Sequence, residues 1–99
     1  MPYYYFALAS QDFLINKEPV EEILRERTNY YHSIKKDIDF WLLKNSDFAY
    51  YSQFRYTEQQ FNRPMAAIVS LDAQFIQWLK LRVGFVKIGT FESSSLILK

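Results

Sequence analysis

The hydrophobic positions of this chain form four short runs separated by longer polar or mixed stretches. Residues 3–9 are aromatic or small and apolar, and residues 38–44, 65–70 and 85–91 are similarly rich in apolar side chains. Runs of this length that contain β-branched and aromatic residues are typical of strands. We therefore predict four strands over these ranges.

Two other stretches have the spacing of an amphipathic helix, with apolar residues three or four positions apart. The first covers residues 20–34 and follows Pro19, which suits the first turn of a helix. The second covers residues 73–83, and either Ser70 or Asp72 can cap its N-terminus. The positions predicted to face the core are Val20, Ile23, Leu24, Tyr31 and Ile34 in the first helix and Phe75, Ile76, Leu79 and Val83 in the second.

The remaining segments lack a clean period. Residues 10–18 are predicted to be a polar connection, and residues 45–63, with aromatic side chains among polar ones, an irregular crossover with a short helix. Residues 92–99 form a tail whose order the sequence leaves open. The length suits one hydrophobic core and no linker or repeat is present, so residues 1–99 are predicted to form a single domain.

The predicted elements follow the order strand, helix, strand, crossover, strand, helix, strand. Two strand–helix–strand units joined in this way commonly form a four-stranded, mainly antiparallel sheet with both helices on one face. The predicted fold is thus α+β, of the ferredoxin-like split βαβ type. Its second face lacks helices, yet residues 38–43 are apolar on both sides of their strand, which normally means burial on both sides. The cover is the crossover, the tail, a second copy in a homodimer, or another protein.

Composition and charge then exclude several classes of partner. Nine Phe, eight Tyr and two Trp are more rings than a small core holds, so we expect several at the surface. The net charge of +1, with both signs interspersed, gives no basic stripe for phosphates, so no nucleic-acid partner is expected. The longest apolar run is far shorter than the roughly 20 residues of a membrane span, so we expect a soluble protein without a transmembrane segment.

The chain also lacks the clusters that catalysis and metal binding need. It has no cysteine, and its one histidine, His32, has no neighbours at metal-site spacing. Two glycines are too few for a phosphate-binding loop. We therefore predict no enzymatic activity, no metal and no cofactor.

Two helical positions combine charge with apolar neighbours. Arg27 lies on the apolar face of the first helix, where its stem can pack at the core edge or its guanidinium can bind a partner's carboxylate; the first is favoured. Arg82 lies one turn after Trp78, with Leu81 pointing further outward. This trio is either an exposed interface patch or a core Trp beside ordinary surface residues.

Asp39 is the third such charge. Strand alternation places it on the face of Trp41 and Leu43. Because a buried, unpaired carboxylate is costly, we expect Asp39 at a strand start or sheet edge, paired with a base, or free for a partner. The candidate bases are Lys35, Lys36, Arg27 and Arg82.

Five stretches together resemble a known family. They are YYYFALAS at residues 3–10, LRER at 24–27, IDFW at 38–41, AAIVS at 66–70 and WLKLR at 78–82. Spread over most of the chain in this order, they resemble the small cyanobacterial and plastid reading-frame family sometimes called low chlorophyll accumulation A. The aromatic crossover and the short C-terminal tail depart from the family pattern.

The resemblance implies an accessory factor of the aerobic oxidative cyclase of chlorophyll biosynthesis, which converts magnesium protoporphyrin IX monomethyl ester to protochlorophyllide. The di-iron chemistry would reside in the membrane-associated cyclase subunit, and this protein would bind and stabilise that subunit. Other enzymes of chlorophyll biosynthesis are further candidate partners. The implied location is the plastid stroma or a cyanobacterial cytoplasm, at the thylakoid membrane through the partner. The family pattern marks Asp39, Phe40 and Arg82 as partner contacts, and Trp78, Leu81 and Arg27 complete the predicted partner-binding surface.

Two alternatives stay open. One is a tetrapyrrole carrier, in which the aromatic sheet face and the crossover form an apolar cleft. The other is an RNA-recognition module, because residues 82–88 weakly resemble the basic–Gly–aromatic pattern of its RNA-binding strand. That pattern lies on the last predicted strand rather than the third, so RNA binding ranks below the carrier.

Overall fold

A computed structural model of the chain describes residues 3–51 and 53–92. Its four strands are β1 (Tyr3–Ser10), β2 (Phe40–Leu43), β3 (Met65–Ser70) and β4 (Lys87–Glu92). They form one sheet of order β2-β3-β1-β4, in which every neighbouring pair runs antiparallel. The predicted α+β, ferredoxin-like arrangement is therefore confirmed.

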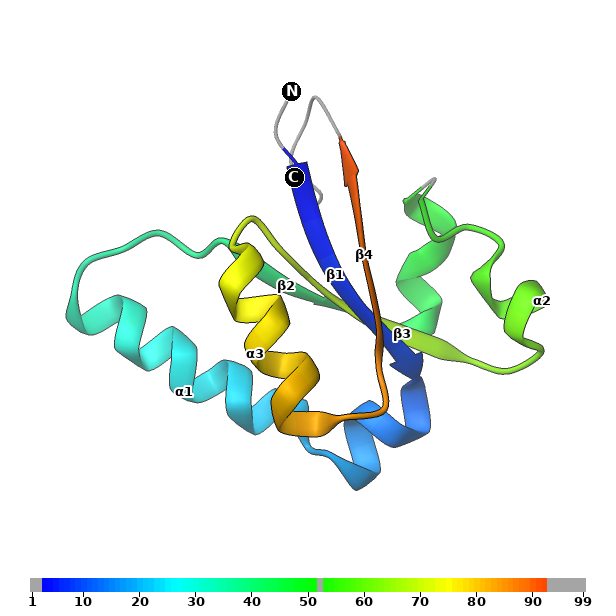
Figure 1. Ribbon diagram of the computed structural model, residues 1–99, viewed down its shortest axis with the longest axis horizontal. Helices are drawn as coiled ribbons and strands as arrows, with labels where there is room; N and C mark the ends of the chain where they lie inside the picture. Colours follow the sequence, from blue (N-terminus) through cyan, green and yellow to red (C-terminus); the bar gives the residue numbers. More distant parts are fainter. Residues whose placement is uncertain (1–2, 52, 93–99) are drawn as a thin grey trace.

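Helical segments cover both faces of this sheet (Figure 1). On one side lie α1 (Val20–Ser33) and α3 (Ala73–Val83), and we call this side the helix face. On the other side lies the crossover between β2 and β3, with η2 (Asn45–Tyr50) and α2 (Thr57–Phe61), and we call this side the crossover face. A further short helix, η1 (Phe13–Lys17), connects β1 to α1.

The boundaries of α3 follow from its local chemistry. The carboxylate of Asp72 accepts hydrogen bonds from the backbone N–H groups of Gln74 and Phe75, which satisfies two donors at the helix start. At the other end, Gly84 has φ 87°, and the N–H of Phe85 donates to the carbonyl of Val83. Such a γ-turn with positive φ favours glycine, and it directs the chain into β4.

The core of the helix face comes from both long helices and from alternate positions of the strands. Leu24 and Tyr31 of α1 and Leu79 of α3 are buried against the sheet. Ala7 and Ile68, directly opposite each other on β1 and β3, supply the sheet side of this layer. The predicted α3 core positions Phe75, Ile76, Leu79 and Val83 are all buried.

The crossover answers which element covers the second face. Phe48 and Phe54, both 3% exposed, pack on Tyr4, Leu43 and Val69 of the sheet. β3 is consequently buried at every position, as expected for a strand covered on both sides. The sheet surface on which the alternatives placed a tetrapyrrole cleft or RNA bases is filled by side chains of this chain.

The predicted bounds of β3 and α3 are confirmed to the residue, whereas three other details are wrong. β2 begins at Phe40 rather than at residue 38. β4 begins at Lys87 rather than at residue 85, because residues 85 and 86 belong to the turn after α3. Ile34, predicted to be in the core, is 49% exposed, since α1 ends at Ser33 and Lys35 turns the chain with φ 57°.

The connection after β1 also differs from the prediction. Residues 10–18 were predicted to be a polar connection, but residues 13–17 form the short helix η1, whose Leu14 is fully buried. At the other end of the chain, Glu92 closes β4, and the rest of the predicted tail, residues 93–99, lies outside the described residues.

Candidate interaction surface

Arg27 joins the two long helices. Its Nη2 atom donates to Oδ2 of Asp72 at 3.1 Å and to the hydroxyl of Tyr31 at 2.9 Å. The guanidinium carbon lies 3.7 Å from the ring centroid of Phe75, close enough for a cation–π contact. The favoured prediction, a guanidinium extending into solvent from the core edge, is therefore wrong, because this group binds α3.

Asp39 continues the same network. The Tyr31 hydroxyl donates to Oδ1 of Asp39 at 2.9 Å, while the Lys36 ammonium lies 3.6 Å from Oδ2. The hydrogen bond to Tyr31, together with the neighbouring Asp39 carboxylate, raises the pKa of Lys36 above its ordinary value. Two of the situations expected for Asp39 are found together: the residue lies at the start of a strand, and its carboxylate is paired with a base, Lys36.

The face assigned to Asp39 from strand alternation is wrong. Alternation placed it with Trp41 and Leu43, which lie on the crossover face. Regular pairing begins only at Phe40, so Asp39 precedes the strand, although its carbonyl still accepts a hydrogen bond from the N–H of Leu71. Its carboxylate is consequently free to meet Tyr31 on the helix face.

Phe40 lies behind this network rather than at the surface. It is 5% exposed, and its ring centroid is 5.3 Å from that of Tyr31 and 5.7 Å from that of Phe75. Its ring is therefore not at the surface, and it supports the rings against which Arg27 packs.

Trp78, Leu81 and Arg82 are exposed, as the interface interpretation of this trio requires. Trp78 is 48% exposed and stacks on Phe75, with ring planes 18° apart, and Leu81 is 86% exposed. Arg82 has its nearest charge partner in Glu18, at 3.8 Å, where the guanidinium is exposed and the carboxylate is partly buried. A long ion pair at the surface contributes little, so the guanidinium is available to another carboxylate.

Two adjoining hollows run along the contact between the long helices, and together we call them the α1–α3 groove. The larger, of about 460 Å³, is lined by Ile23, Glu26, Arg27, Tyr30, Asp72, Gln74, Phe75 and Trp78. The smaller, of about 180 Å³, is lined by Glu18, Pro19, Glu22, Ile23, Glu26 and Arg82. Ile23 and Glu26 belong to both, so the two hollows adjoin each other.

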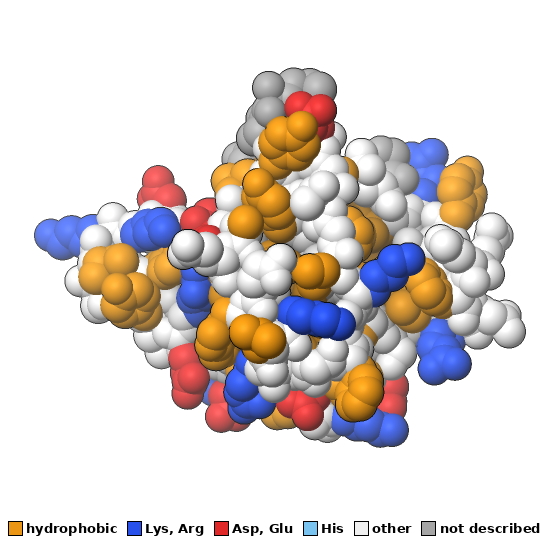
Figure 2. All heavy atoms as spheres, viewed as in Figure 1, with side chains coloured by type: hydrophobic (Ala, Val, Ile, Leu, Met, Phe, Trp, Pro, Cys, Tyr) orange, Lys and Arg blue, Asp and Glu red, His pale blue; other side chains and the backbone are white. Residues whose placement is uncertain are grey.

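The groove collects three of the six residues predicted to bind a partner. Arg27, Trp78 and Arg82 line it directly. Asp39 and Phe40 are connected to it through Tyr31 and Phe75. Leu81, the sixth, is exposed on α3 but does not line the groove. Figure 2 shows hydrophobic side chains over α1 and α3, with charged groups of both signs around them.

The sequence analysis missed two contributors to this surface. Tyr31 was predicted only as a core residue, and Asp72 only as a helix cap, although each also binds Arg27. The acidic wall of Glu22 and Glu26 was not singled out either. Their spacing of four residues was the available signal, because it places both carboxylates on one side of a helix.

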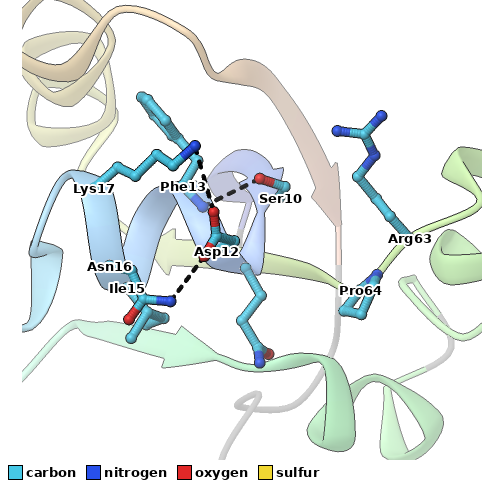
Figure 3. Close-up of a pocket in the computed structure, with 9 residues that line it drawn as sticks. Ser10, Asp12, Phe13, Ile15, Asn16, Lys17, Arg63 and Pro64 are labelled. Carbon is cyan, nitrogen blue, oxygen red and sulfur yellow. Dashed lines mark hydrogen bonds and ion pairs between the residues drawn. The ribbon is translucent and has the colours of Figure 1, made fainter.

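A separate hollow of about 480 Å³ lies where β1 meets η1 and the start of β3 (Figure 3). Its polar groups bind one another: Asn16 donates to Asp12 at 2.9 Å, and Lys17 lies 3.6 Å from the same carboxylate. The hydrogen bond from Asn16, and then the charge of Lys17, lower the pKa of Asp12. None of the predicted site residues lines this hollow.

Within the described ranges 3–51 and 53–92, the structure has no group of three or more His, Asp or Glu side chains placed to hold a metal ion. In the same part of the chain, no helix is long and apolar enough to cross a membrane.

The chain resembles proteins of plastids and cyanobacteria. The family model described as "Ycf54 protein" matches residues 2–93. "Uncharacterized protein ycf54" of Porphyra purpurea is 50% identical over 94 residues, covering 95% of this chain and 87% of that protein. "Protein YCF54, chloroplastic" of Arabidopsis thaliana is 33% identical over 94 residues, covering 94% of this chain and 44% of that protein.

The fold is similar to a solved structure as well. The structure of the Ycf54 protein from Synechocystis sp. PCC6803 matches with a TM-score of 0.78 and 40% identity, covering 96% of this chain and 89% of that chain. The similarity extends over the sheet and both of its faces, since nearly the whole chain is aligned.

Proposed function

Because this chain belongs to the Ycf54 family, we propose that it is a non-catalytic accessory factor in chlorophyll biosynthesis that binds and stabilises the oxidative cyclase. In this role it supports the conversion of magnesium protoporphyrin IX monomethyl ester to protochlorophyllide, while the di-iron chemistry stays in the membrane-associated cyclase subunit. The resemblance noted in the sequence is confirmed at the level of the family, and the cyclase role follows from that resemblance.

One observation supports a binding role more than any other. Residues singled out in the sequence for partner contact, Arg27, Trp78 and Arg82, come from two different helices and line one groove. Arg and Trp are the residue types that dominate the energetics of protein interfaces. The groove therefore has the composition of a protein-binding surface.

The proposal gives the predicted residues two kinds of role. Trp78, Leu81 and Arg82 touch the cyclase, because their side chains are exposed. Arg27, Asp39 and Phe40 position the surface, since they are partly or fully buried and bind α1, α3 and β2 to one another.

Relatives in a chloroplast and in a cyanobacterium support the proposed location. We place the protein in the plastid stroma or the cyanobacterial cytoplasm, where contact with the cyclase brings it to the thylakoid membrane. Association with the membrane is then indirect, and it is lost when the contact with the cyclase is lost.

Co-purification of the cyclase with tagged variants in a cyanobacterial host tests the proposal. Arg82→Ala and Trp78→Ala are expected to reduce recovery of the cyclase at least about fivefold, because each removes an interface side chain of a type that commonly contributes more than 1 kcal/mol. Arg55→Ala and Tyr50→Ala, exposed residues of the crossover, are the matched controls and should retain full recovery.

Protochlorophyllide formation in the same strains provides the second measurement. It should fall in the two groove variants and stay normal in the two controls. Undiminished co-purification together with normal protochlorophyllide in the groove variants would contradict the proposal.

A further inference from the structure

We propose that the α1–α3 groove binds an amphipathic helix of the partner protein whose polar flank carries Lys or Arg. The apolar side of that helix packs on Tyr30 and Trp78, and its basic residues pair with Glu22 and Glu26. The inference rests on the proposed function, because it specifies the kind of segment that this surface takes from its partner.

The shape of the groove suits a helix. It follows α1, whose 14 residues extend over about 21 Å at 1.5 Å per residue. Figure 1 shows α1 and α3 lying on the same side of the sheet and diverging toward the C-terminal end of α1. A third helix laid between two such helices contacts both, which is the geometry of helix-in-groove recognition.

Aromatic side chains on both walls supply the apolar contact. Tyr30 of α1 is 61% exposed and Trp78 of α3 is 48% exposed, and both line the larger hollow. Stacking on buried Phe75 holds the indole in place, so little side-chain entropy is lost when it is covered. Two exposed aromatic residues facing one hollow provide anchors for residues spaced three or four apart on a partner helix.

The net charge of the groove is negative, because four acids (Glu18, Glu22, Glu26 and Asp72) and two bases (Arg27 and Arg82) line it. Arg27 is bound to Asp72 at 3.1 Å, and Arg82 lies 3.8 Å from Glu18. By contrast, the exposed Glu22 and Glu26 have no basic side chain within 4.0 Å in the described part of the chain. In Figure 2, acidic side chains lie along the lower edge of the region occupied by α1.

The negative charge of the groove determines which kinds of partner can bind there. An acidic helix or an anionic lipid surface would be repelled by the two carboxylates. A second copy docked symmetrically would bury the acidic residues of both chains in one interface, because an isologous contact uses the same patch twice. A helix with Lys or Arg beside an apolar stripe satisfies both the aromatic and the acidic wall.

The groove is also held in shape before anything binds. Arg27 ties α1 to α3 through Asp72 and Phe75, and Tyr31 ties α1 to the start of β2 through Asp39. A surface that is already ordered loses less entropy on binding than a flexible one.

Two synthetic peptides of about 18 residues, five turns of helix, test this inference with the full chain. Both carry the same stripe of Leu, and they differ in having either Lys or Glu on the flanks; binding is followed by fluorescence anisotropy of the labelled peptides. The Lys peptide is expected to bind at least about tenfold more tightly than the Glu peptide. Equal affinities overturn the inference.

Variants of the chain locate the binding. The double variant Glu22→Gln/Glu26→Gln is expected to bind the Lys peptide about tenfold more weakly, and Trp78→Ala to weaken both peptides to a similar degree. The control Asp12→Asn/Glu92→Gln neutralises two exposed acids elsewhere and should leave the affinity within about twofold. An unchanged affinity in Glu22→Gln/Glu26→Gln, or a dimer in solution that Trp78→Ala dissociates, overturns the inference.

Cyclase co-purification separates this inference from the proposed function. If the cyclase is recovered in an Arg82-dependent manner but both peptides bind equally, the accessory role stands and the basic-helix inference fails. If the peptides behave as expected and the cyclase is not recovered with the unmodified chain, the groove binds a basic helix and the cyclase role fails.

Discussion

On the crossover face, Phe54 packs among Phe6, Phe48 and Phe91, with ring centroids 5.2 to 5.9 Å apart. On the helix face, the rings of Tyr31 and Phe75 surround the guanidinium of Arg27. The first arrangement is a closed apolar layer. The second contains the Arg27 guanidinium and the carboxylates of Asp39 and Asp72, and it borders a groove that is open to solvent. The two faces of one sheet thus bury aromatic rings for different purposes.

The comparison explains why the chain is so rich in aromatic residues. The helices of the crossover are short, so large rings rather than a long amphipathic helix cover the sheet there. On the helix face, α1 and α3 already supply the core, and additional rings form the walls of the groove. Substitutions on the crossover face should therefore change stability alone, and those on the helix face should also change binding.

The largest expected effect belongs to the crossover face. Phe54→Ala removes a ring that is 3% exposed and should lower the free energy of unfolding by about 3–5 kcal/mol. Urea unfolding measures this loss, and Tyr50→Ala, in which an 81% exposed ring is removed, is the control. Where the variant is still folded, its affinity for the Lys peptide should match that of the unmodified chain. A loss of less than about 1 kcal/mol would mean that the crossover is not a structural cover.

A smaller loss is expected from the network on the helix face. Arg27→Ala removes the ion pair with Asp72 and the cation–π contact with Phe75, and should lower the free energy of unfolding by about 2 kcal/mol. Unlike Phe54→Ala, this variant should also bind the Lys peptide more weakly, because the two walls of the groove are no longer tied together.

Two further substitutions show whether the geometry of Arg27 or only its charge is required. Arg27→Lys keeps the charge but lacks the planar donors that reach Asp72 and Tyr31 together, so it should recover less than half of the loss. Arg25→Ala, on the exposed side of the same helix, should stay within about 0.5 kcal/mol of the unmodified chain. If Arg27→Lys recovers the full free energy of unfolding, only the positive charge at residue 27 is required.

The sequence predicted the scaffold well because its signals are local. The spacing of apolar residues in α3 and the apolar run Met65–Val69 of β3 each define an element without information from elsewhere. The network of Arg27 could not be predicted in the same way, since Asp72 lies 45 residues away in the chain. Which of two distant helices supplies a partner depends on their packing, and that is not encoded in a local pattern.

Failures of the strand patterns have equally specific causes. Alternation gave the wrong face for Asp39 because it requires a regular strand, and β2 starts one residue later. Gly89 was predicted simply as part of a strand, yet the ring of Phe6 lies over it, and a Cβ atom there would be 2.5 Å from Cζ of Phe6. The crossover was one of four candidate covers, because aromatic residues without a period do not indicate where they pack.

The smallest effect, and the one that both faces share, is a loss of stability in alkali. Burial raises the pKa of Tyr4 above its ordinary 10.0, and burial followed by the charge of Asp47 does the same for Tyr51, both on the crossover face. On the helix face, the hydrogen bond to Tyr31 and the charge of Asp39 raise the pKa of Lys36 above 10.5.

Each of these groups binds its proton more tightly in the folded chain than in the unfolded chain. Their contribution to folding is therefore complete below pH 10 and is lost as the pH rises through the raised values. Melting temperatures between pH 9 and pH 11 should fall less steeply in Tyr51→Phe, which removes one titration from the crossover face, and in Lys36→Met, which removes one from the helix face. Slopes identical to that of the unmodified chain in both variants would show that neither group is linked to folding, and a change in only one would assign the alkaline loss to a single face of the sheet.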